Sequence, residues 1–414
     1  MKKIHMWLFL AFASVVTVTV SQAQNVVTEW NTITSTTINQ GGKGGDAFLY
    51  FAYTSIAVYD ATNSIHRRFR PFYFGGITDR NASDEAAAIS AAHTILVHYF
   101  PAQKATLDRE FEQSLHDILA SPQAKDNGVE AGVAAAQTLI AVRTNDGLEA
   151  DITYTPGTAP GDWQPTPPGF LPPAIAWLQF MRPFTMKSAS QFLSRGPYPL
   201  SSEQWVADYS LTRLFGESNS SIRTPKQTEI GLFWTDNAFF QDARAWSKLA
   251  QHYHLDVPDS ARLIAILWTG LSDALIGCFN GKYTFGFWRP VTAIEAGGAN
   301  PELVADAGWI PLGITPNHPE YPAAHACGTS AVSSLVADYF GTPNVHVVMD
   351  SLVFKDGVHT HTFENTADWL DEVFWARIYA GFHFHHSLQD GVELGRRVSH
   401  QLFLDNFQPV DHRY

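Results

Sequence analysis

Residues 281–290 read Gly-Lys-Tyr-Thr-Phe-Gly-Phe-Trp-Arg-Pro and place two cations within an aromatic stretch. Lys282 and Arg289 are seven residues apart, about two turns of an α-helix, so on one helix they would face the same way. Two cations in this setting suggest a buried anion, although long cationic side chains more commonly extend along a surface. Alone, the segment indicates an anion site only weakly.

Two later segments carry chemistry of the same kind. Residues 318–327 read His-Pro-Glu-Tyr-Pro-Ala-Ala-His-Ala-Cys. Pro322 suits the first turn of a helix, whose free amides can bind an anion, and His325 would stand one turn in. Residues 376–383 read Ala-Arg-Ile-Tyr-Ala-Gly-Phe-His. Arg377 would lie near a helix end there, and its guanidinium can donate two hydrogen bonds to a tetrahedral oxyanion.

The first 23 residues have the pattern of a secretory signal peptide. Lys2 and Lys3 precede an apolar run, and Ser21-Gln22-Ala23 supplies a small-x-small cleavage site. The run is shorter than the roughly 20 residues that cross a bilayer, so we expect no membrane span after its removal. The sequence therefore predicts an exported protein, periplasmic or extracellular.

Size, net charge and cysteine content limit the fold and the kinds of molecule that we expect this chain to bind. The chain has 414 residues, of which 45% are hydrophobic, enough for one large domain or two packed subdomains. Its formal charge is −13, so nucleic acid is not an expected partner, and a local cluster of cations becomes more informative. The two cysteines, Cys278 and Cys327, fit either a disulfide or two buried thiols.

Helical patterns dominate the sequence, and strand patterns are scarce. Residues 154–199 contain ten prolines, so we expect an ordered, extended segment that braces the helices and borders the pocket. We place a domain boundary near residue 225, between an N-terminal helical region (24–225) and a C-terminal region (226–414) that carries the site. The predicted helices are 47–65, 83–98, 102–119, 129–143, 201–215, 225–251 with breaks, 259–281, 323–340, 366–381 and one from 387.

Together, the three segments resemble the signature of the vanadium-dependent haloperoxidase and type-2 phosphatidic acid phosphatase superfamily. The superfamily pattern is Lys-x6-Arg-Pro, then Pro-Ser-Gly-His, then Ser-Arg-x5-His. In this chain it reads Lys282…Arg289-Pro290, Pro322-Ala323-Ala324-His325 and Ala376-Arg377…His383. Residues 52–65 and 161–170 are also similar to the bacterial haloperoxidase-like branch. The resemblance implies an all-α fold of helical bundles of the haloperoxidase and acid phosphatase type, with the proline-rich segment as an extended insertion.

The resemblance also implies how the chain would hold its cofactor, vanadate. Lys282, Arg289 and Arg377 would neutralise the oxyanion, and the backbone amide of Ala324 would donate to it. His383 would bind vanadium through a ring nitrogen. Phosphate can occupy the same site, because vanadate and the phosphoryl transition state share a trigonal bipyramidal geometry.

The same resemblance implies a reaction between hydrogen peroxide and a halide. Lys282 would polarise bound peroxide, and His325 would be the acid–base residue, which suits the range of imidazole pKa values. His318, seven residues before His325, would line the halide side of the pocket or be an ordinary loop histidine. The alternative is a soluble acid phosphatase, in which His383 attacks the phosphorus of a phosphate ester and forms a phosphohistidine.

This chain departs from the superfamily pattern at several positions. Ala323 replaces the motif serine and removes a hydroxyl donor, while Ala324 and Ala376 are milder changes. Many relatives carry Asp four residues after the ligand histidine, where this chain has Ser387. Ser387 with Asp390 fits a helix-capping box, or Asp390 orients a histidine instead. With these changes the site could bind phosphate without turnover, which leaves a non-catalytic oxyanion-binding protein as a second alternative.

Other enzyme classes find less support in the residues. A zinc hydrolase would need three or four ligands, but the chain has no HExxH helix or paired cysteine knuckle. A serine hydrolase would need a GxSxG elbow, which is not supported. The histidines that invite the zinc hypothesis are His359, His361, His385 and His386.

Overall fold

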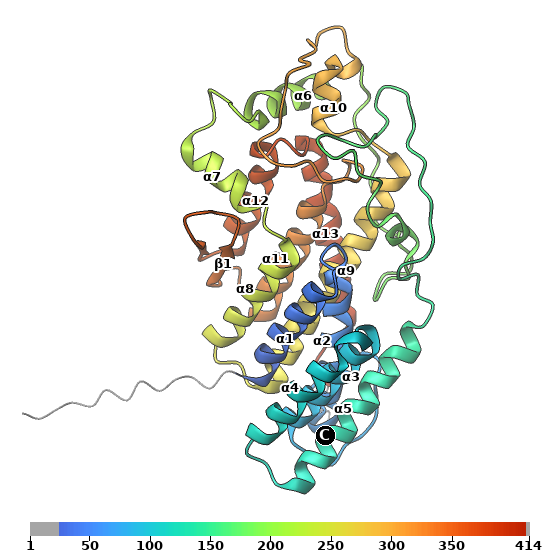
Figure 1. Ribbon diagram of the computed structural model, residues 1–414, viewed down its shortest axis with the longest axis vertical. Helices are drawn as coiled ribbons and strands as arrows, with labels where there is room; N and C mark the ends of the chain where they lie inside the picture. The colour runs from blue at the N-terminus through green and yellow to red at the C-terminus, as the bar shows by residue number, and fades with distance from the viewer. Residues whose placement is uncertain (1–24, 411–414) are drawn as a thin grey trace, which may run out of the picture.

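The computed structural model describes residues 25–410, and within them helices predominate (Figure 1). Thirteen α-helices, three short 3-10 helices and one two-stranded sheet follow one another along this part of the chain. The predicted all-α class, built from helical bundles, is confirmed. The predicted signal peptide, residues 1–23, lies outside the described residues.

The first five helices pack at one end of the molecule (Figure 1). Ser83 caps α3, as predicted, by accepting a hydrogen bond from a first-turn amide. α5 begins at Pro122 rather than at residue 129, because the Ser121 hydroxyl caps it. The first of the five was not predicted. The elements are α1 (Val26–Gln40), α2 (Ala47–His66), α3 (Asp84–Tyr99), a 3-10 turn (Pro101–Gln103), α4 (Lys104–Asp117) and α5 (Pro122–Arg143).

The long helix α9 (Val257–Phe285) joins the two halves and packs against α2 in one and α11 in the other (Figure 1). It is the one helix among residues 25–410 that is long and apolar enough to cross a membrane. However, 94% of its most apolar window is buried within the protein. A helix that is apolar on every side belongs in a core, so α9 is the core helix of this fold.

The C-terminal helices pack around the second half of α9. Glycines let α13 approach α11 closely, because a Cβ at Gly395 would lie 2.3 Å from the carbonyl oxygen of Cys327. This close packing fixes α11, which carries His325. The helices of this half are α6 (Glu203–Gly216), α7 (Pro225–Phe233), α8 (Ala238–His252), α10 (Pro290–Glu295), α11 (Ala324–Phe340), α12 (Thr366–Tyr379) and α13 (His385–Asp405), with 3-10 turns at Ala176–Phe180 and Gly297–Ala299.

The proline-rich segment, residues 154–199, is ordered and mostly extended, as predicted. The Trp163 amide donates to the Gly286 carbonyl oxygen (2.6 Å), and the Ala174 amide donates to that of Asn317 (2.9 Å). The segment thereby braces the two loops that carry site residues. It also borders the pocket, because Ala174 lines the cavity described below.

One hairpin was not predicted from the sequence. Strands β1 (Val347–Ser351) and β2 (His359–Phe363) pair antiparallel, with Val347 opposite Phe363. It packs against α8 and α12, beside the C-terminal bundle.

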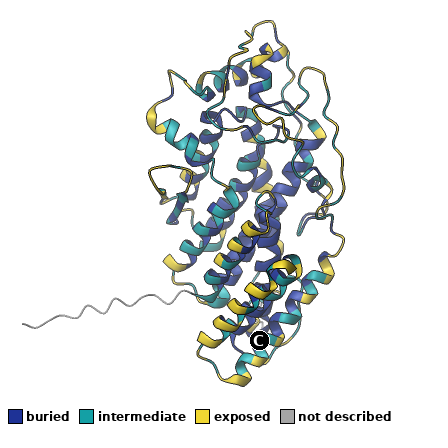
Figure 2. Cartoon of the chain, viewed as in Figure 1, coloured by how far each residue is buried: buried dark blue, intermediate teal, exposed yellow. Residues whose placement is uncertain are grey.

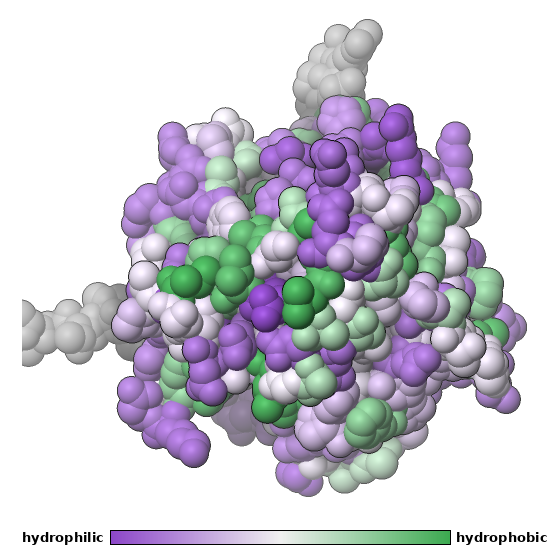
Figure 3. All heavy atoms as spheres, turned by 90° about the horizontal axis from the view of Figure 1, so that it is seen from above, coloured by the Kyte–Doolittle hydropathy of each residue, from purple (hydrophilic) through white to green (hydrophobic). Residues whose placement is uncertain are grey.

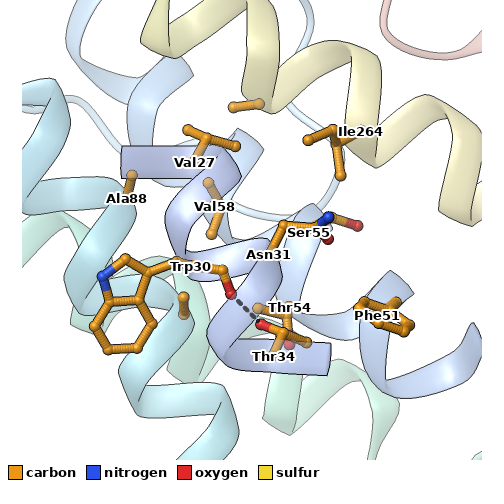
Figure 4. Close-up of a pocket in the computed structure, with 12 residues that line it drawn as sticks. Val27, Trp30, Asn31, Thr34, Phe51, Thr54, Ser55, Val58, Ala88 and Ile264 are labelled. Atoms are coloured by element: carbon orange, nitrogen blue, oxygen red, sulfur yellow. Dashed lines mark hydrogen bonds between the residues drawn. The ribbon is translucent and has the colours of Figure 1, made fainter. Parts of the chain in front are cut away.

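Buried residues follow the inward faces of the helices, and exposed residues gather on the loops (Figure 2). Seen from the α6 and α10 end, the surface mixes hydrophilic and hydrophobic residues (Figure 3). A small interior cavity of about 20 Å³ lies among α1, α2, α3 and α9 (Figure 4). There the Thr34 hydroxyl donates to the Trp30 carbonyl oxygen (2.7 Å). None of the predicted site residues lines this cavity.

Candidate active site

The three predicted segments meet at a second, larger cavity of about 310 Å³. Lys282 and Arg289 are fully buried and lie next to residues that line the cavity: Lys282 Nζ is 5.9 Å from the ring centre of Phe279, and Arg289 Nη1 is 3.3 Å from His383 Nε2. The structure therefore brings all seven predicted site residues together. Five of them line the cavity directly: His318, Ala324, His325, Arg377 and His383.

Lys282 lies in the last turn of α9, beneath the loop that carries His318. Its Nζ donates to the carbonyl oxygens of Pro319 (2.9 Å) and Glu320 (2.8 Å). Burial lowers its pKa to about 8, and the charge of Arg289 acts in the same direction. An ammonium carries three protons, so one N–H of Lys282 remains for a ligand.

Arg289 does not share a helix with Lys282, so the prediction of two cations on one helical face was wrong. α9 ends at Phe285, where Gly286 adopts a left-handed conformation (φ 56°). Arg289 then lies at the N-cap position of α10. The two cations come together because the chain turns between them, and helical spacing has no part in it.

The Arg289 guanidinium connects two of the site segments. It donates to the carbonyl oxygen of His318 (2.8 Å) and to that of Phe382 (3.0 Å). Its Nη2 also lies 3.0 Å from Nδ1 of His318. Burial lowers the pKa of Arg289 to about 10. These contacts fix His318 and the backbone next to His383 relative to each other.

Arg377 lies in the last turn of α12 and lines the cavity. Its Nη1 donates to the Trp234 carbonyl oxygen (2.6 Å), and its guanidinium lies 4.8 Å from the ring centre of Phe382. Its Nε is buried without a hydrogen-bond partner. Burial lowers the pKa of Arg377 to about 9, with a further contribution from the charge of Arg289. This guanidinium therefore keeps donor capacity for a ligand.

His383 is held by a carboxylate that sequence reasoning missed. Its Nδ1 lies 2.7 Å from Oε1 of Glu320, which also accepts from the Phe384 amide (3.1 Å). Both side chains are almost completely buried. Burial raises the pKa of Glu320 to about 7, while Lys282 and Arg289 act against that rise. The signal was present, because Glu320 is the one carboxylate in the segment from His318 to His325.

The contacts of His383 define its tautomer. Arginine can only donate, so His383 Nε2, 3.3 Å from Arg289 Nη1, presents its lone pair. The proton then lies on Nδ1 and is donated to Glu320. Burial and the charges of Arg289, Lys282 and Arg377 hold the pKa of His383 well below its usual value. The imidazole is therefore neutral, and its unprotonated Nε2 could bind a metal or attack phosphorus once the contact with Arg289 Nη1 is released.

His325 is the second residue of α11, which begins at Ala324, one residue after the predicted start at 323, so Pro322 precedes the helix and is not in its first turn. The first-turn amides of this helix, including that of Ala324, have no acceptor within the helix. The Nε2 of His325 is buried without a partner. Burial and the charge of Arg377 hold its pKa well below the usual value. A neutral imidazole thus lies beside a helix N-terminus in the cavity wall.

The charges of this cluster do not balance. Lys282, Arg289 and Arg377 are at most 2% exposed, and none of them forms an ion pair with Glu320, whose carboxylate contacts His383 and is near enough for Lys282 and Arg289 to lower its pKa. Unpaired buried charges are strongly unfavourable. A tetrahedral dianion or trianion would supply the missing charge, and the free donors of Arg377, Lys282 and Ala324 would meet its oxygens. The residues present therefore fit vanadate or phosphate.

His318 lines the cavity beside Phe279, whose ring centre lies 5.0 Å from the imidazole. Its Nδ1 faces Arg289 and the Pro319 carbonyl oxygen (3.2 Å). Burial and the charges of Lys282 and Arg289 hold its pKa well below the usual value. Its assignment to the halide side stays a prediction, but it is not a solvated loop histidine.

The predicted capping box was wrong. α13 begins at His385, and Ser387 lies within its first turn, beside Glu320, where it caps no amide. The histidine that Asp390 contacts is His386, whose Nε2 lies 3.4 Å away, and Asp390 also accepts from the Tyr321 hydroxyl.

His361, His386 and the two cysteines are engaged with neighbouring side chains or buried in the protein. His361 lies between Glu229 (3.1 Å) and Glu372 (2.6 Å), and His386 stacks on Tyr198. Within residues 25–410, no group of three or more His, Cys, Asp or Glu side chains is arranged to hold a metal ion. Of the two possibilities left open for the cysteines, the structure shows the second, since both are free, buried thiols: Cys278 and Cys327.

Comparison with known proteins bears on the fold and on the C-terminal half of the chain. Residues 262–411 match the VCPO second helical-bundle domain. The chain has the helical fold of the vanadium haloperoxidases, and the resemblance stated from the three motifs is confirmed.

Particular relatives support this class at low identity. The chain is 26% identical over 235 residues to vanadium chloroperoxidase of Curvularia inaequalis, a match that spans 45% of this chain and 38% of that relative. A bacterial vanadium-dependent iodoperoxidase has a similar structure, with a TM-score of 0.77 at 20% identity, covering 94% of this chain and 98% of that one. A holo-type bacterial vanadium-dependent chloroperoxidase gives a TM-score of 0.68 at 17% identity, covering 86% and 90%.

Proposed function

We propose that this chain is an enzyme that binds vanadate at the buried cation cluster and oxidises a halide with hydrogen peroxide. One observation carries the proposal: three buried cations, of which Arg377 keeps an unpaired Nε donor, surround a neutral histidine whose Nε2 carries no proton. The relatives of this fold are haloperoxidases, and the likeness extends over most of the chain. We also propose export, based on the predicted leader at residues 1–23.

The cations and the α11 amides would hold the oxyanion. Lys282, Arg289 and Arg377 would neutralise it, and the amide of Ala324 would donate to one oxygen. When bound, vanadate supplies the Lewis acid that activates hydrogen peroxide. The free N–H of Lys282 would then stabilise negative charge on the substrate oxygen, because a buried donor acts strongly in a low-dielectric site.

The histidines divide the remaining tasks. His383 would be the ligand through Nε2, since Glu320 accepts the proton of Nδ1 and keeps the ring in that tautomer. His325 would take a proton from hydrogen peroxide, because it is neutral and its Nε2 has no partner in the protein. His318 would face the halide beside Phe279.

The Glu320–His383 pair also favours a second candidate function, a soluble acid phosphatase. A carboxylate that accepts from Nδ1 raises the basicity of Nε2, and a nucleophilic imidazole needs this basicity to attack phosphorus. The same cations would then hold the phosphoryl oxygens. Both candidates use the same residues, so the reaction itself has to separate them.

The test is a paired assay on protein stripped of bound anions, with His383→Ala as the site variant and His385→Ala as the matched control. Halide oxidation would be followed after reloading with orthovanadate, and phosphate-ester hydrolysis without it. We expect vanadate-dependent halide oxidation that disappears in His383→Ala and survives in His385→Ala. Hydrolysis alone, with the same dependence on His383, would instead establish the phosphatase. Neither activity in a folded protein would contradict both and support a non-catalytic oxyanion-binding protein.

A further inference from the structure

The cavity extends well beyond the oxyanion cluster. Besides the histidines and Arg377, its wall includes residues of α8, of the middle of α9, and of the loop at Gly44–Gly45. Its volume is about 310 Å³, whereas a single water needs roughly 10–15 Å³ in the same measure. Hydrogen peroxide and a halide ion would leave most of this space unfilled.

Most of the additional wall is apolar. Leu271, Leu275 and Phe279 of α9 face Phe239 of α8 and Ile175 of the proline-rich segment across the space. Cavities of this kind, apolar with a few polar groups, are typical of sites for small organic molecules.

One polar group in this wall has no partner in the protein. Asp242, on α8, lines the cavity and makes no hydrogen bond to any residue from 25 to 410. Its neighbour Arg244 is engaged elsewhere, with Asp236 (2.7 Å) and the Asp350 carbonyl oxygen (3.0 Å). Burial raises the pKa of Asp242 to about 8, so at neutral pH it is mostly a protonated acid. Asp242 is partly exposed and lines the cavity, so its carboxyl proton is available to an acceptor that enters from outside the protein.

We propose that the cavity binds a neutral, mainly apolar organic molecule of aromatic-ring size, whose hydrogen-bond acceptor receives the proton of Asp242. The molecule is the halogen acceptor of the proposed function, and this role rests on that function. In the transfer, an aromatic C–H bond breaks and a carbon–halogen bond forms. Hypohalous acid supplies the halogen, and its hydroxide leaves with the displaced proton as water.

Binding is tested without vanadate, peroxide or halide. The probes are 4-methoxyacetophenone, which has a carbonyl acceptor, and 4-ethylanisole, which has nearly the same shape without it. Ligand-detected NMR titration gives a Kd for each. We expect wild type to bind both, and Asp242→Leu to lower the preference for the ketone by about 3- to 10-fold, the loss of one hydrogen bond. Asp242→Asn, which keeps an N–H donor, should retain most of the preference.

Two further variants show whether the probes occupy this cavity. Thr329→Phe places a ring where α11 lines the space, so both probes should bind at least 10-fold more weakly. Asp338→Asn changes a carboxyl outside the cavity and should leave both Kd values unchanged. No saturable binding to wild type would overturn the proposal, and so would an unchanged preference in a folded Asp242→Leu.

The acceptor role is tested separately from halide oxidation. Halogenation of 4-methoxyacetophenone would be measured with excess methionine, which consumes free hypohalous acid. We expect wild type to form a protected fraction of product that Asp242→Leu loses while its halide oxidation continues. Halide oxidation with all product quenched by methionine would overturn the acceptor role and leave the proposed function standing. Absence of halide oxidation with Asp242-dependent binding would contradict the proposed function while supporting the organic site.

Discussion

Replacing Arg377 with methionine should stabilise the anion-free protein and remove its response to oxyanions. A pKa lowered from 12.5 to about 9 means that the folded state holds this charge at a cost of up to about 5 kcal/mol. Methionine removes that cost but leaves the Trp234 carbonyl oxygen without its donor, a loss of about 1–3 kcal/mol. We therefore expect a net gain of up to about 2–4 kcal/mol without anion, seen as an upward shift of Tm.

Although Arg377→Met should stabilise the anion-free protein, it should reduce the additional stabilisation that comes from bound orthovanadate. Wild type at an orthovanadate concentration 100 times its Kd should gain about 2.7 kcal/mol from binding. Arg377→Met removes charge-assisted hydrogen bonds worth about 1.5–3 kcal/mol, so its Kd should rise about 10- to 150-fold. At the same orthovanadate concentration the variant should therefore gain only about 0.3–1.4 kcal/mol from binding.

Thermal unfolding with and without orthovanadate measures both effects in one experiment. Arg397→Met is the control, because Arg397 is an exposed cation paired with Glu393 on α13, and its response to anion should equal that of wild type. If Arg377→Met lowered the anion-free Tm and kept the full response to orthovanadate, the reasoning about an uncompensated buried charge would be refuted.

Three further predictions follow from single contacts. Glu320→Ala should lower turnover about 10- to 100-fold, and 15N NMR should show a mixture of His383 tautomers. Glu320→Gln keeps a hydrogen-bond acceptor and should retain most of the Nδ1–H tautomer, so equal effects of the two variants would contradict a positioning role for Glu320. Asp242→Asn should be most stabilising at high pH, because between about pH 4 and pH 8 the wild-type carboxyl is ionised in the unfolded chain but protonated in the folded one, and wild type loses up to about 1.4 kcal/mol of stability per pH unit. Urea titrations that show a constant stability difference between the two proteins across this range would contradict the raised pKa. Ala323→Ser should stabilise the protein by about 0.5–2 kcal/mol, because α11 has no side-chain cap, and should tighten orthovanadate binding, because the hydroxyl adds a donor. Unfolding measures the first effect and equilibrium dialysis the second; if neither is seen, the added hydroxyl is not accommodated at this buried position.

The sequence predicted the helical class and most helices, because apolar periodicity and caps such as Ser83 are local signals. It did not predict the hairpin at Val347–Phe363, whose second strand alternates histidine and threonine and lacks an apolar face. The start of α13 was also misplaced by two residues, because Ser387 has the right chemistry for a cap but lies one turn too far along, beside Glu320.

For the site, the motifs identified which residues meet, while the reason that they meet came from the structure. Helical spacing suggested one face for Lys282 and Arg289, yet a left-handed Gly286 separates them onto two elements. Many relatives carry Asp four residues after the ligand histidine, but here the partner of His383 is Glu320, which lies 63 residues upstream. A contact of that range depends on how α9, α11 and α12 pack, which no local pattern contains. No sequence pattern indicated that Asp242 lines a cavity and has no hydrogen-bond partner within residues 25–410, because both properties depend on the packing of α8 against α9.

Equilibrium dialysis of orthovanadate against anion-stripped protein tests the central claim, that the buried cations form one oxyanion site ligated by His383. We predict one saturable equivalent per chain, displaced one-for-one by phosphate and at least 10-fold weaker in His383→Ala and Arg377→Met. Stoichiometric binding that neither variant weakens, or no saturable binding to folded wild type, would contradict the account.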